Sequence, residues 1–176
     1  NKEADTSYDF FGHKVVLPVF AAPVGAMTLH YGDKYDDPTY NDILVSTCAQ
    51  AGIAAFTGDG VNPAVMEGAV EAMEKNNGCG VPTVKPWNME LIEQKMELVN
   101  RANPIAIAMD IDAAGLPFLK NMQPPAGSKT VEELKQIARW AKKPFILKGI
   151  MTVAGAEKAL EAGASGIVVS NHGGRV

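Results

Sequence analysis

The sequence has few cysteines, no excess of basic residues and no long apolar run. Each of these absences argues against a class of protein. Its two cysteines, Cys48 and Cys79, show no CxxC spacing, which disfavours a zinc site or a disulfide framework. We expect both to be buried or free thiols. The formal net charge is −4 and the pI is about 5.4, so no nucleic-acid partner is expected.

Membrane and secretion signals are also missing. No apolar run approaches the roughly 20 residues of a membrane helix, and the polar start over residues 1–9 is unlike a signal peptide. We therefore expect no membrane partner and a cytoplasmic location. What the chain does have is 47% hydrophobic and 20% charged residues over 176 positions, which suits one packed globular domain.

Short apolar runs alternate with helical segments along the chain. The runs predict buried strands, and the segments between them predict helices with clear start signals, such as Asn62 before Pro63 and Thr130 three residues before Glu133. The expected strands cover 19–23, 53–57, 81–84, 105–109, 145–147 and 166–169, and the expected helices 36–50, 62–75, 88–103, 130–141 and 153–162. This repeat indicates parallel strands joined by right-handed crossovers.

Three further expectations concern less regular parts of the chain. Residues 10–17 suggest a short hairpin before the first strand. For the helix over 36–50, the helical spacing of Ile43, Leu44, Thr47, Cys48 and Ala51 predicts the inward face. Residues 113–129 contain three prolines and little periodicity, which predicts a loop insertion.

Polar residues close most of the expected strands, and this decides between two α/β folds. They are Asp59, Lys85, Asp110, Asp112, Lys148 and His172. A doubly wound sheet binds its ligand at one switch point, whereas a barrel brings all its strand ends to one mouth. We therefore predict a (β/α)8 TIM barrel. A complete barrel needs about 200 to over 400 residues, so residues 1–176 are expected to form a single partial domain of about six βα units, with the last two absent.

The stretch from Pro144 to Arg175 predicts a positively charged pocket. Lys148 closes one apolar run, and Ser170, His172 and Arg175 follow the next. Cationic side chains at the ends of neighbouring strands favour an anionic ligand. Each of these residues also has a simpler interpretation, with His172 as a turn residue and Lys148 as a solvated strand end, but their combination favours a site.

A metal site is a second interpretation of this region. Asp110 and Asp112 could together hold magnesium, since carboxylate oxygens are its preferred ligands. No further acidic or histidine partner is fixed beside them by the sequence, so we expect no metal.

Two segments carry a resemblance to a known family. Ser170-Asn171-His172-Gly173-Gly174-Arg175 and Leu147-Lys148-Gly149-Ile150 resemble the signature and the lysine strand of the FMN-dependent α-hydroxy-acid oxidases and dehydrogenases, such as glycolate oxidase and lactate oxidase. The resemblance implies FMN as cofactor, oxidation of a small 2-hydroxy acid to the 2-oxo acid, and assembly as a homo-oligomer. It is strong over the last third of the chain.

The resemblance also implies roles for individual residues. His172 corresponds to the base that takes a proton from the substrate, and Asp112 to the aspartate that orients this histidine. Arg175 corresponds to the clamp on the substrate carboxylate, a task suited to a planar guanidinium. Lys148 corresponds to the cation that stabilises negative charge on the reduced flavin.

Further residues correspond to parts of the family's flavin site. Ala22-Pro23 resembles the segment whose backbone contacts the flavin ring. Together with Val24, Thr57 and Ser170, these residues are the remaining cofactor-binding candidates. The phosphate site of such barrels is built after strands seven and eight, which we expect to lie outside this sequence.

The chain departs from the family pattern at two strand ends. The family has a substrate-binding tyrosine on the third strand, but residues 81–87 contain none, and Lys85 could supply charge to the substrate or the flavin instead. Asp110 stands where the family has a neutral hydroxyl residue. A carboxylate there would be unfavourable unless it is paired with Lys85 or Lys148.

Two other functions remain open at this point. One is a related FMN barrel with a different reaction, such as a type 2 isopentenyl diphosphate isomerase, although the Asn-His-Gly-Gly-Arg run argues against it. The other is a flavin-binding barrel that has lost turnover through Asp110 and the missing tyrosine.

Overall fold

The computed structural model describes residues 4–123 and 125–176, apart from the side chains of Phe118 and Lys120. The chain divides into two compact units, which we describe separately. Unit 1 comprises Asn1–Pro82 and Ala102–Ile105, and unit 2 comprises Thr83–Arg101 and Ala106–Val176. Strand β5 contributes its first half to unit 1 and its second half to unit 2.

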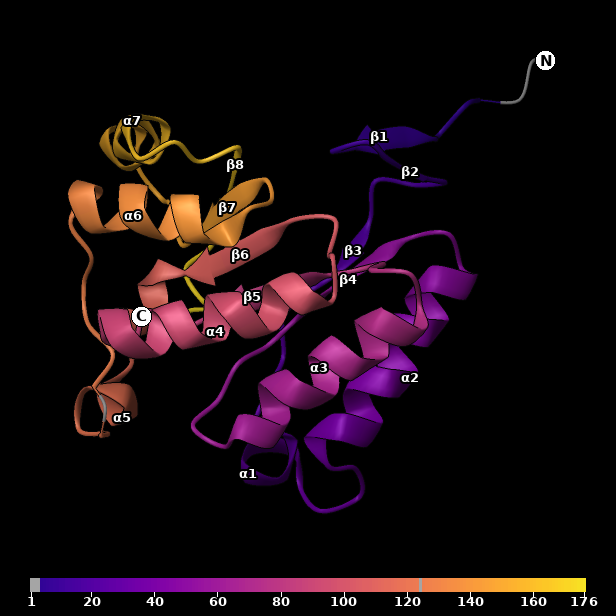
Figure 1. The fold of residues 1–176 in the computed structure, drawn as a ribbon, viewed down its shortest axis with the longest axis horizontal. Coiled ribbons are helices and arrows are strands. Elements are labelled where there is room, and N and C mark those ends of the chain that lie inside the picture. Colours follow the sequence, from indigo (N-terminus) through magenta and orange to yellow (C-terminus); the bar gives the residue numbers. More distant parts are fainter. Residues whose placement is uncertain (1–3, 124) are drawn as a thin grey trace. The chain divides into compact units, whose positions relative to one another are not determined.

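The main sheet has six parallel strands whose order in the sheet is their order along the chain (Figure 1). They are β3 (Phe20–Ala21), β4 (Ala54–Thr57), β5 (Val81–Val84), β6 (Ile107–Asp110), β7 (Phe145–Lys148) and β8 (Gly166–Val168). A doubly wound sheet reverses its strand order at a switch point, and this sheet shows no reversal among its described strands. The sequential order is that of a barrel, as the sequence predicts.

The four middle strands are apolar because both of their faces are covered. Every residue of β4, β5, β6 and β7 is buried. Parallel strands packed between layers require such continuous apolar runs, so only the strand ends remain for charged side chains. This is why the charged residues of β6 and β7, Asp110 and Lys148, are the last residues of these strands.

Unit 1 begins with the expected hairpin. Strands β1 (Tyr8–Phe10) and β2 (His13–Val15) pair antiparallel around Phe11 and Gly12, which both have positive φ. The first parallel strand, β3, has only two residues and is shorter than the predicted 19–23.

Helices α2 (Asp37–Gln50) and α3 (Pro63–Lys75) lie side by side in unit 1 (Figure 1). The predicted inward face of α2 is wrong in part, because Ile43 is 49% exposed while Asn41 and Val45 are buried with Cys48. Asn41 is tolerated inside because its amide donates to the Val65 carbonyl at 3.2 Å. A pattern of apolar residues alone cannot identify a buried asparagine.

The short helix α1 (Met27–Tyr31) follows β3 and was not predicted. It has five residues and is preceded by Ala26 in the left-handed region, at φ 56°. Its first N–H, from Met27, is bound by the buried Asp37 carboxylate at 3.1 and 3.2 Å. A long-range contact of this kind has no local sequence signal.

Unit 2 contains the predicted helices α4 (Met89–Arg101), α6 (Val131–Ala141) and α7 (Val153–Glu161). Helix α6 starts with the predicted capping box, in which Thr130 and Glu133 each bind the other's backbone N–H. The loop predicted over 113–129 is wrong in part, since it includes most of a 3-10 turn, η1 (Ile111–Gly115), and the one-turn helix α5 (Pro117–Lys120).

The two cysteines are free and buried, as predicted. Burial raises the pKa of both thiols, which keeps them protonated near neutral pH. Among the described residues, no helix is both long and apolar enough to cross a membrane.

Candidate active site

The carboxyl ends of the strands in unit 2 lie level with one another. Asp110, the last residue of β6, is paired in register with Lys148, the last residue of β7, and Lys148 with Val168 of β8. Because the strands are parallel, the residues that follow them emerge at one edge of the sheet. The segment 111–112, Gly149 and the loop after β8 therefore begin side by side.

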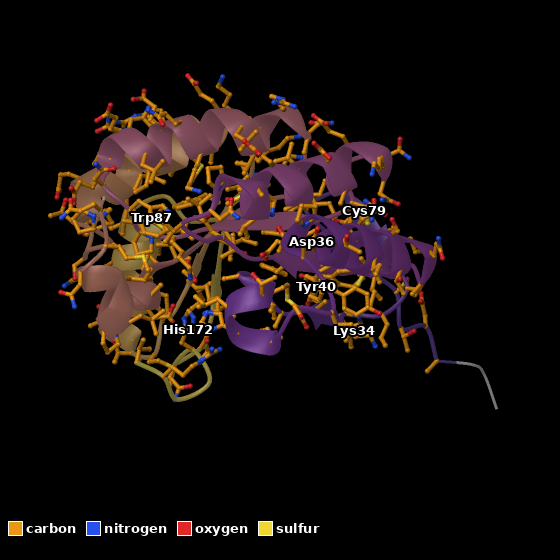
Figure 2. The ribbon with its side chains drawn as sticks, turned by 90° about the horizontal axis from the view of Figure 1, so that it is seen from below. Lys34, Asp36, Tyr40, Cys79, Trp87 and His172 are labelled. Atoms are coloured by element: carbon orange, nitrogen blue, oxygen red, sulfur yellow. The ribbon has the colours of Figure 1, made fainter. Side chains whose placement is uncertain are left out.

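His172 and Asp112 form the centre of this edge. The His172 Nδ1 lies 3.1 Å from the Asp112 Oδ1, and the two side chains are 13% and 6% exposed. His172 sits on the loop that follows β8 (Figure 2). Since an ionised carboxylate can only accept, we assign the proton to Nδ1, which leaves Nε2 with a lone pair. The contact thus prepares Nε2 to act as a base.

The backbone of His172 is fixed by local contacts that the sequence reasoning did not anticipate. Its N–H donates to the Ser170 Oγ at 3.1 Å, and its φ of 57° lies in the left-handed region. The structure therefore gives Ser170, predicted as a cofactor ligand, a contact that positions the histidine. The signal for this contact is a serine two residues before a turn residue, a local serine turn.

Lys148 completes a compact cluster with His172 and Asp112. Its Nζ lies 3.4 Å from both carboxylate oxygens of Asp112 and 3.4 Å from the His172 Nδ1. Burial alone would raise the pKa of Asp112, but the hydrogen bond from His172 and the charge of Lys148 outweigh it, so the pKa is lowered. Asp112 is therefore an anion that both neighbours stabilise.

Gly149 allows Asp112 to approach the end of β7. It has φ 104°, and a Cβ at this position would lie 2.6 Å from both the Cβ and the Cγ of Asp112. Only glycine combines this backbone conformation with that space. The glycine after Lys148 is thus required by the site, which the sequence reasoning did not recognise.

Lys85 and Asp110 form a second ion pair at the same edge. The register of Val84 with Met109 places the next residues of the two strands beside each other. The Lys85 Nζ lies 3.3 Å from the Asp110 Oδ2, with side-chain exposures of 13% and 7%. From the sequence we expect Asp110 to be paired with Lys85 or Lys148, and the structure shows the pair with Lys85.

Asp110, Asp112 and His172 are also close enough to share a cation, since one ligand atom from each lies within 4.8 Å of the others. However, the ammonium groups of Lys85 and Lys148 already contact these two carboxylates. A metal ion would have to displace both, and like charges at such distances repel strongly. We assign no metal to this cluster.

Arg175 extends from the loop after β8 toward solvent. Its Nε donates to the His172 carbonyl at 2.9 Å, and the residue is exposed. Within 4–123 and 125–176, no carboxylate forms an ion pair with it. Its outer N–H groups can therefore bind an anion next to His172.

The remaining candidates lie in unit 1. Ala22, Pro23 and Val24 follow β3, and Thr57 ends β4. The Val24 carbonyl accepts a hydrogen bond from the Gly58 N–H at 3.2 Å, and a Cβ on Gly58 would lie 2.5 Å from that carbonyl. The segment after β3 thus runs directly against the end of β4.

Two observations test whether these residues fit a flavin. Lys148 provides a cation at a strand end, where negative charge on a reduced ring would be stabilised. The Thr57 Oγ1 is fully buried and has no hydrogen-bond partner among the described residues, an uncommon state that a bound polar ring would relieve. Each group, considered within its own unit, suits the polar part of such a ring.

The fold and the site define a segment of a (β/α)8 barrel with a histidine base candidate backed by an aspartate and a lysine. Comparison with known proteins agrees. Residues 118–176 match the family model of FMN-dependent dehydrogenases. This range contains Lys148, His172 and Arg175, although not Asp112.

Two curated relatives illustrate the match. The chain is 53% identical over 51 residues to an FMN-dependent alpha-hydroxy acid dehydrogenase of Schizosaccharomyces pombe, which is 29% of this chain and 12% of that protein. It is 36% identical over 93 residues to an L-lactate dehydrogenase of Stenotrophomonas maltophilia, which is 51% of this chain and 23% of that protein.

A solved structure extends the likeness to the whole chain. The crystal structure of a Pediococcus acidilactici lactate oxidase superposes with a TM-score of 0.75 at 23% identity, over 99% of this chain and 52% of that one. This chain therefore spans about half the length of that relative. The barrel fold is confirmed, as is the resemblance to the FMN-dependent α-hydroxy-acid oxidases and dehydrogenases.

Proposed function

We propose that the protein containing this chain oxidises a small 2-hydroxy acid to the corresponding 2-oxo acid with FMN as cofactor. The observation that carries the proposal is the contact of His172 with Asp112 and of Asp112 with Lys148, at 3.1 to 3.4 Å, within and beside the segment that matches the FMN-dependent dehydrogenase model. The names of the matched relatives support the same reaction class.

Each of the site residues has its own task in the proposed reaction. Arg175 binds the carboxylate of the acid through its outer N–H groups, which places the 2-hydroxyl near the adjacent His172. The Nε2 of His172 then takes a proton from the substrate. Asp112 stabilises the resulting imidazolium through the hydrogen bond to Nδ1.

Lys148 serves the cofactor rather than the substrate. FMN, when bound, would supply the acceptor for the two electrons released at C2 of the acid. The Lys148 ammonium is held by Asp112 at the strand end and stabilises negative charge on its other side. Ala22, Pro23, Val24 and Thr57 are proposed to line the flavin ring, with the buried Thr57 hydroxyl as a hydrogen-bonding group.

The proposal is tested on the full-length, flavin-loaded protein. The flavin should bleach when lactate, glycolate or mandelate is added without oxygen, and 2-oxo acid should form in equal amount to the reduced flavin. A yellow protein whose flavin stays oxidised with all three acids would refute the proposal and leave a non-catalytic flavin-binding barrel. The cytoplasmic location and the homo-oligomeric state stay predictions.

A further inference from the structure

The Lys85–Asp110 pair has no task in the reaction as described so far. Both side chains are largely buried, with exposures of 13% and 7%, and they come from the ends of neighbouring strands β5 and β6. Burying an ion pair removes two charges from water, and apolar side chains of similar volume are often at least as stable. A role in ligand recognition would explain why the charged residues are present.

The pair lies beside the histidine. One carboxylate oxygen of Asp110 lies within 4.8 Å of a ligand atom of both Asp112 and His172. Asp110 is therefore close to the imidazole that receives the substrate's proton. A substrate bound at His172 would have its side chain near Asp110 and Lys85.

The backbone around Lys85 is anchored. The Trp87 N–H donates to the Lys85 carbonyl at 2.8 Å, and Trp87 is buried. The next carbonyl, of Pro86, accepts from the Gly127 N–H at 2.9 Å and from the Lys129 Nζ at 3.1 Å. The turn after β5 is thus held in place, and Lys85 stays within reach of Asp110.

The lysines and aspartates beside His172 form two ion pairs. Lys85 is matched by Asp110 and Lys148 by Asp112, each at 3.3 to 3.4 Å. Beyond these pairs, Arg175 on the loop after β8 brings one further positive charge, with no ion pair among the described residues. One guanidinium binds one carboxylate in a bidentate manner.

We propose that the Lys85–Asp110 pair restricts the site to 2-hydroxy acids with a single carboxylate and excludes 2-hydroxy dicarboxylates. This inference rests on the proposed function, because it assumes that Arg175 holds the acid's first carboxylate. A second carboxylate of the substrate, if it lay beside the pair, would be repelled by the charge of Asp110. The Lys85 ammonium already forms an ion pair with Asp110 and would compensate this repulsion only weakly. Repulsion between like charges in a partly desolvated pocket rejects the wrong ligand.

The test measures binding rather than turnover. The full-length, flavin-loaded protein is titrated calorimetrically with two product-like acids of equal chain length, 2-oxopentanoate with one carboxylate and 2-oxoglutarate with two. Wild type should bind the monocarboxylate at least about tenfold more tightly, a free-energy difference of about 1.4 kcal/mol. Equal binding of the two acids, or no binding of either, overturns the inference.

Two substitutions assign the selectivity to the pair. Asp110→Asn leaves the Lys85 ammonium without this carboxylate, so 2-oxoglutarate should gain at least about tenfold relative to 2-oxopentanoate. Lys85→Met should weaken the binding of 2-oxoglutarate further, because Asp110 then loses the compensating charge of Lys85. An Asp110→Asn protein that folds and keeps the wild-type ratio overturns the inference.

A control and a second variant keep this test decisive. Glu161→Gln removes a carboxylate from the exposed Lys135–Glu161 pair, which has the same 3.3 Å separation, and should leave the ratio unchanged. If Asp110→Asn does not fold, Asp110→Ser removes the same charge with a smaller, uncharged side chain. It should likewise raise the binding of 2-oxoglutarate relative to 2-oxopentanoate at least about tenfold, and an unchanged ratio would contradict the inference.

The outcomes also separate this inference from the proposed function. Selective binding of 2-oxopentanoate without flavin reduction by any 2-hydroxy acid would refute the reaction and leave the selectivity intact. Equal reduction by 2-hydroxy monocarboxylates and dicarboxylates would support the reaction and refute the selectivity.

Discussion

His172 is held from two sides, by Asp112 at its ring and by Ser170 at its backbone. The ring contact sets the tautomer, and the backbone contact sets the direction in which the ring leaves the chain. A base that is oriented in this way needs no rearrangement before it accepts a proton.

Replacing His172, the proposed base, should affect turnover more than binding. We expect His172→Gln to lower kcat for the best 2-hydroxy acid by about 10² to 10⁴, the usual contribution of a general base, with a smaller change in KM. Steady-state kinetics of the flavin-loaded protein measures both quantities. A variant that retains more than about a tenth of wild-type kcat would show that another group takes the proton.

Gly149 gives a prediction about stability at the same scale. Gly149→Ala forces alanine into φ 104° and places a methyl group against Asp112, so we expect a loss of about 2 to 5 kcal/mol in unfolding free energy. Gly163→Ala is the matched control, because Gly163 has φ 83° but no atom within 4 Å of the added Cβ. It should lose only about 1 to 2 kcal/mol. Equal losses in urea denaturation would mean that the contact with Asp112 is unimportant.

The sequence predicts individual residues best where their chemistry is local. The turn at His172 and the lysine after an apolar run follow from spacing, and the structure brings both together with Asp112. The requirement for glycine at 149 could not be predicted, because it depends on how closely Asp112 approaches from a different strand. For the same reason, the sequence could predict only that Asp110 needs a cationic partner, either Lys85 or Lys148. The structure shows that Lys85 forms this ion pair.

At the scale of elements, the helix starts carry the strongest local signals. Helix α6 begins with Thr130 and Glu133, whose hydrogen bonds measure 3.2 and 2.7 Å. Asn62 at α3 and Thr152 at α7 act similarly through a single side-chain contact. These starts were predictable because the groups involved are within four residues of each other.

Removing the cap of α6 should destabilise the protein modestly. We expect Thr130→Ala to cost about 1 kcal/mol of unfolding free energy, since the N–H groups of the first turn lose their acceptor. Thr152→Ala, at the start of α7, serves as comparison and should cost no more, because α7 has a side-chain cap without the reciprocal glutamate. Urea denaturation followed by circular dichroism measures both. A Thr130→Ala protein as stable as wild type would show that water replaces the cap fully.

The elements that were missed or misplaced depend on distant partners. Helix α1 is held by the Asp37 carboxylate, and the inward face of α2 includes Asn41 because of the Val65 carbonyl. Neither acceptor lies near its donor in the sequence. A prediction based on apolar periodicity therefore assigned the wrong residues to part of the buried face of α2 and did not include α1.

At the scale of the whole molecule, acid should weaken the fold in part through Asp112. Its pKa is lowered in the folded state, so its contribution to stability is fully present above its unfolded value of about 4. That contribution is lost as the pH falls through the lower folded value. Unfolding free energies measured between about pH 2 and pH 6 should therefore fall more steeply for wild type than for Asp112→Asn.

The comparison in acid has its own control. Asp112→Asn leaves Lys148 without its carboxylate and should be less stable at neutral pH, so the slopes rather than the absolute values are compared. Glu161→Gln, in an exposed pair, should follow the wild-type slope. Parallel curves for wild type and Asp112→Asn would contradict the assignment.

The strand order is the feature of the whole chain that the sequence predicts most fully. A regular alternation of apolar runs and helices implies sequential parallel pairing, and the six strands follow it. Lengths were less certain, since β3 has two residues where five were expected. Strand length depends on pairing partners, which the sequence of one strand does not contain.

The pairing of charges at the strand ends also affects how fast a ligand arrives. Lys85 and Lys148 each stand within 3.4 Å of a carboxylate, so at separations beyond a screening length of about 8 Å their fields nearly cancel. An approaching acid is then attracted chiefly by Arg175. We expect association rates measured by stopped flow to depend only weakly on ionic strength, and Asp110→Asn to make that dependence steeper. The site would thus select its ligand at contact and exert little attraction on anions in the surrounding solution.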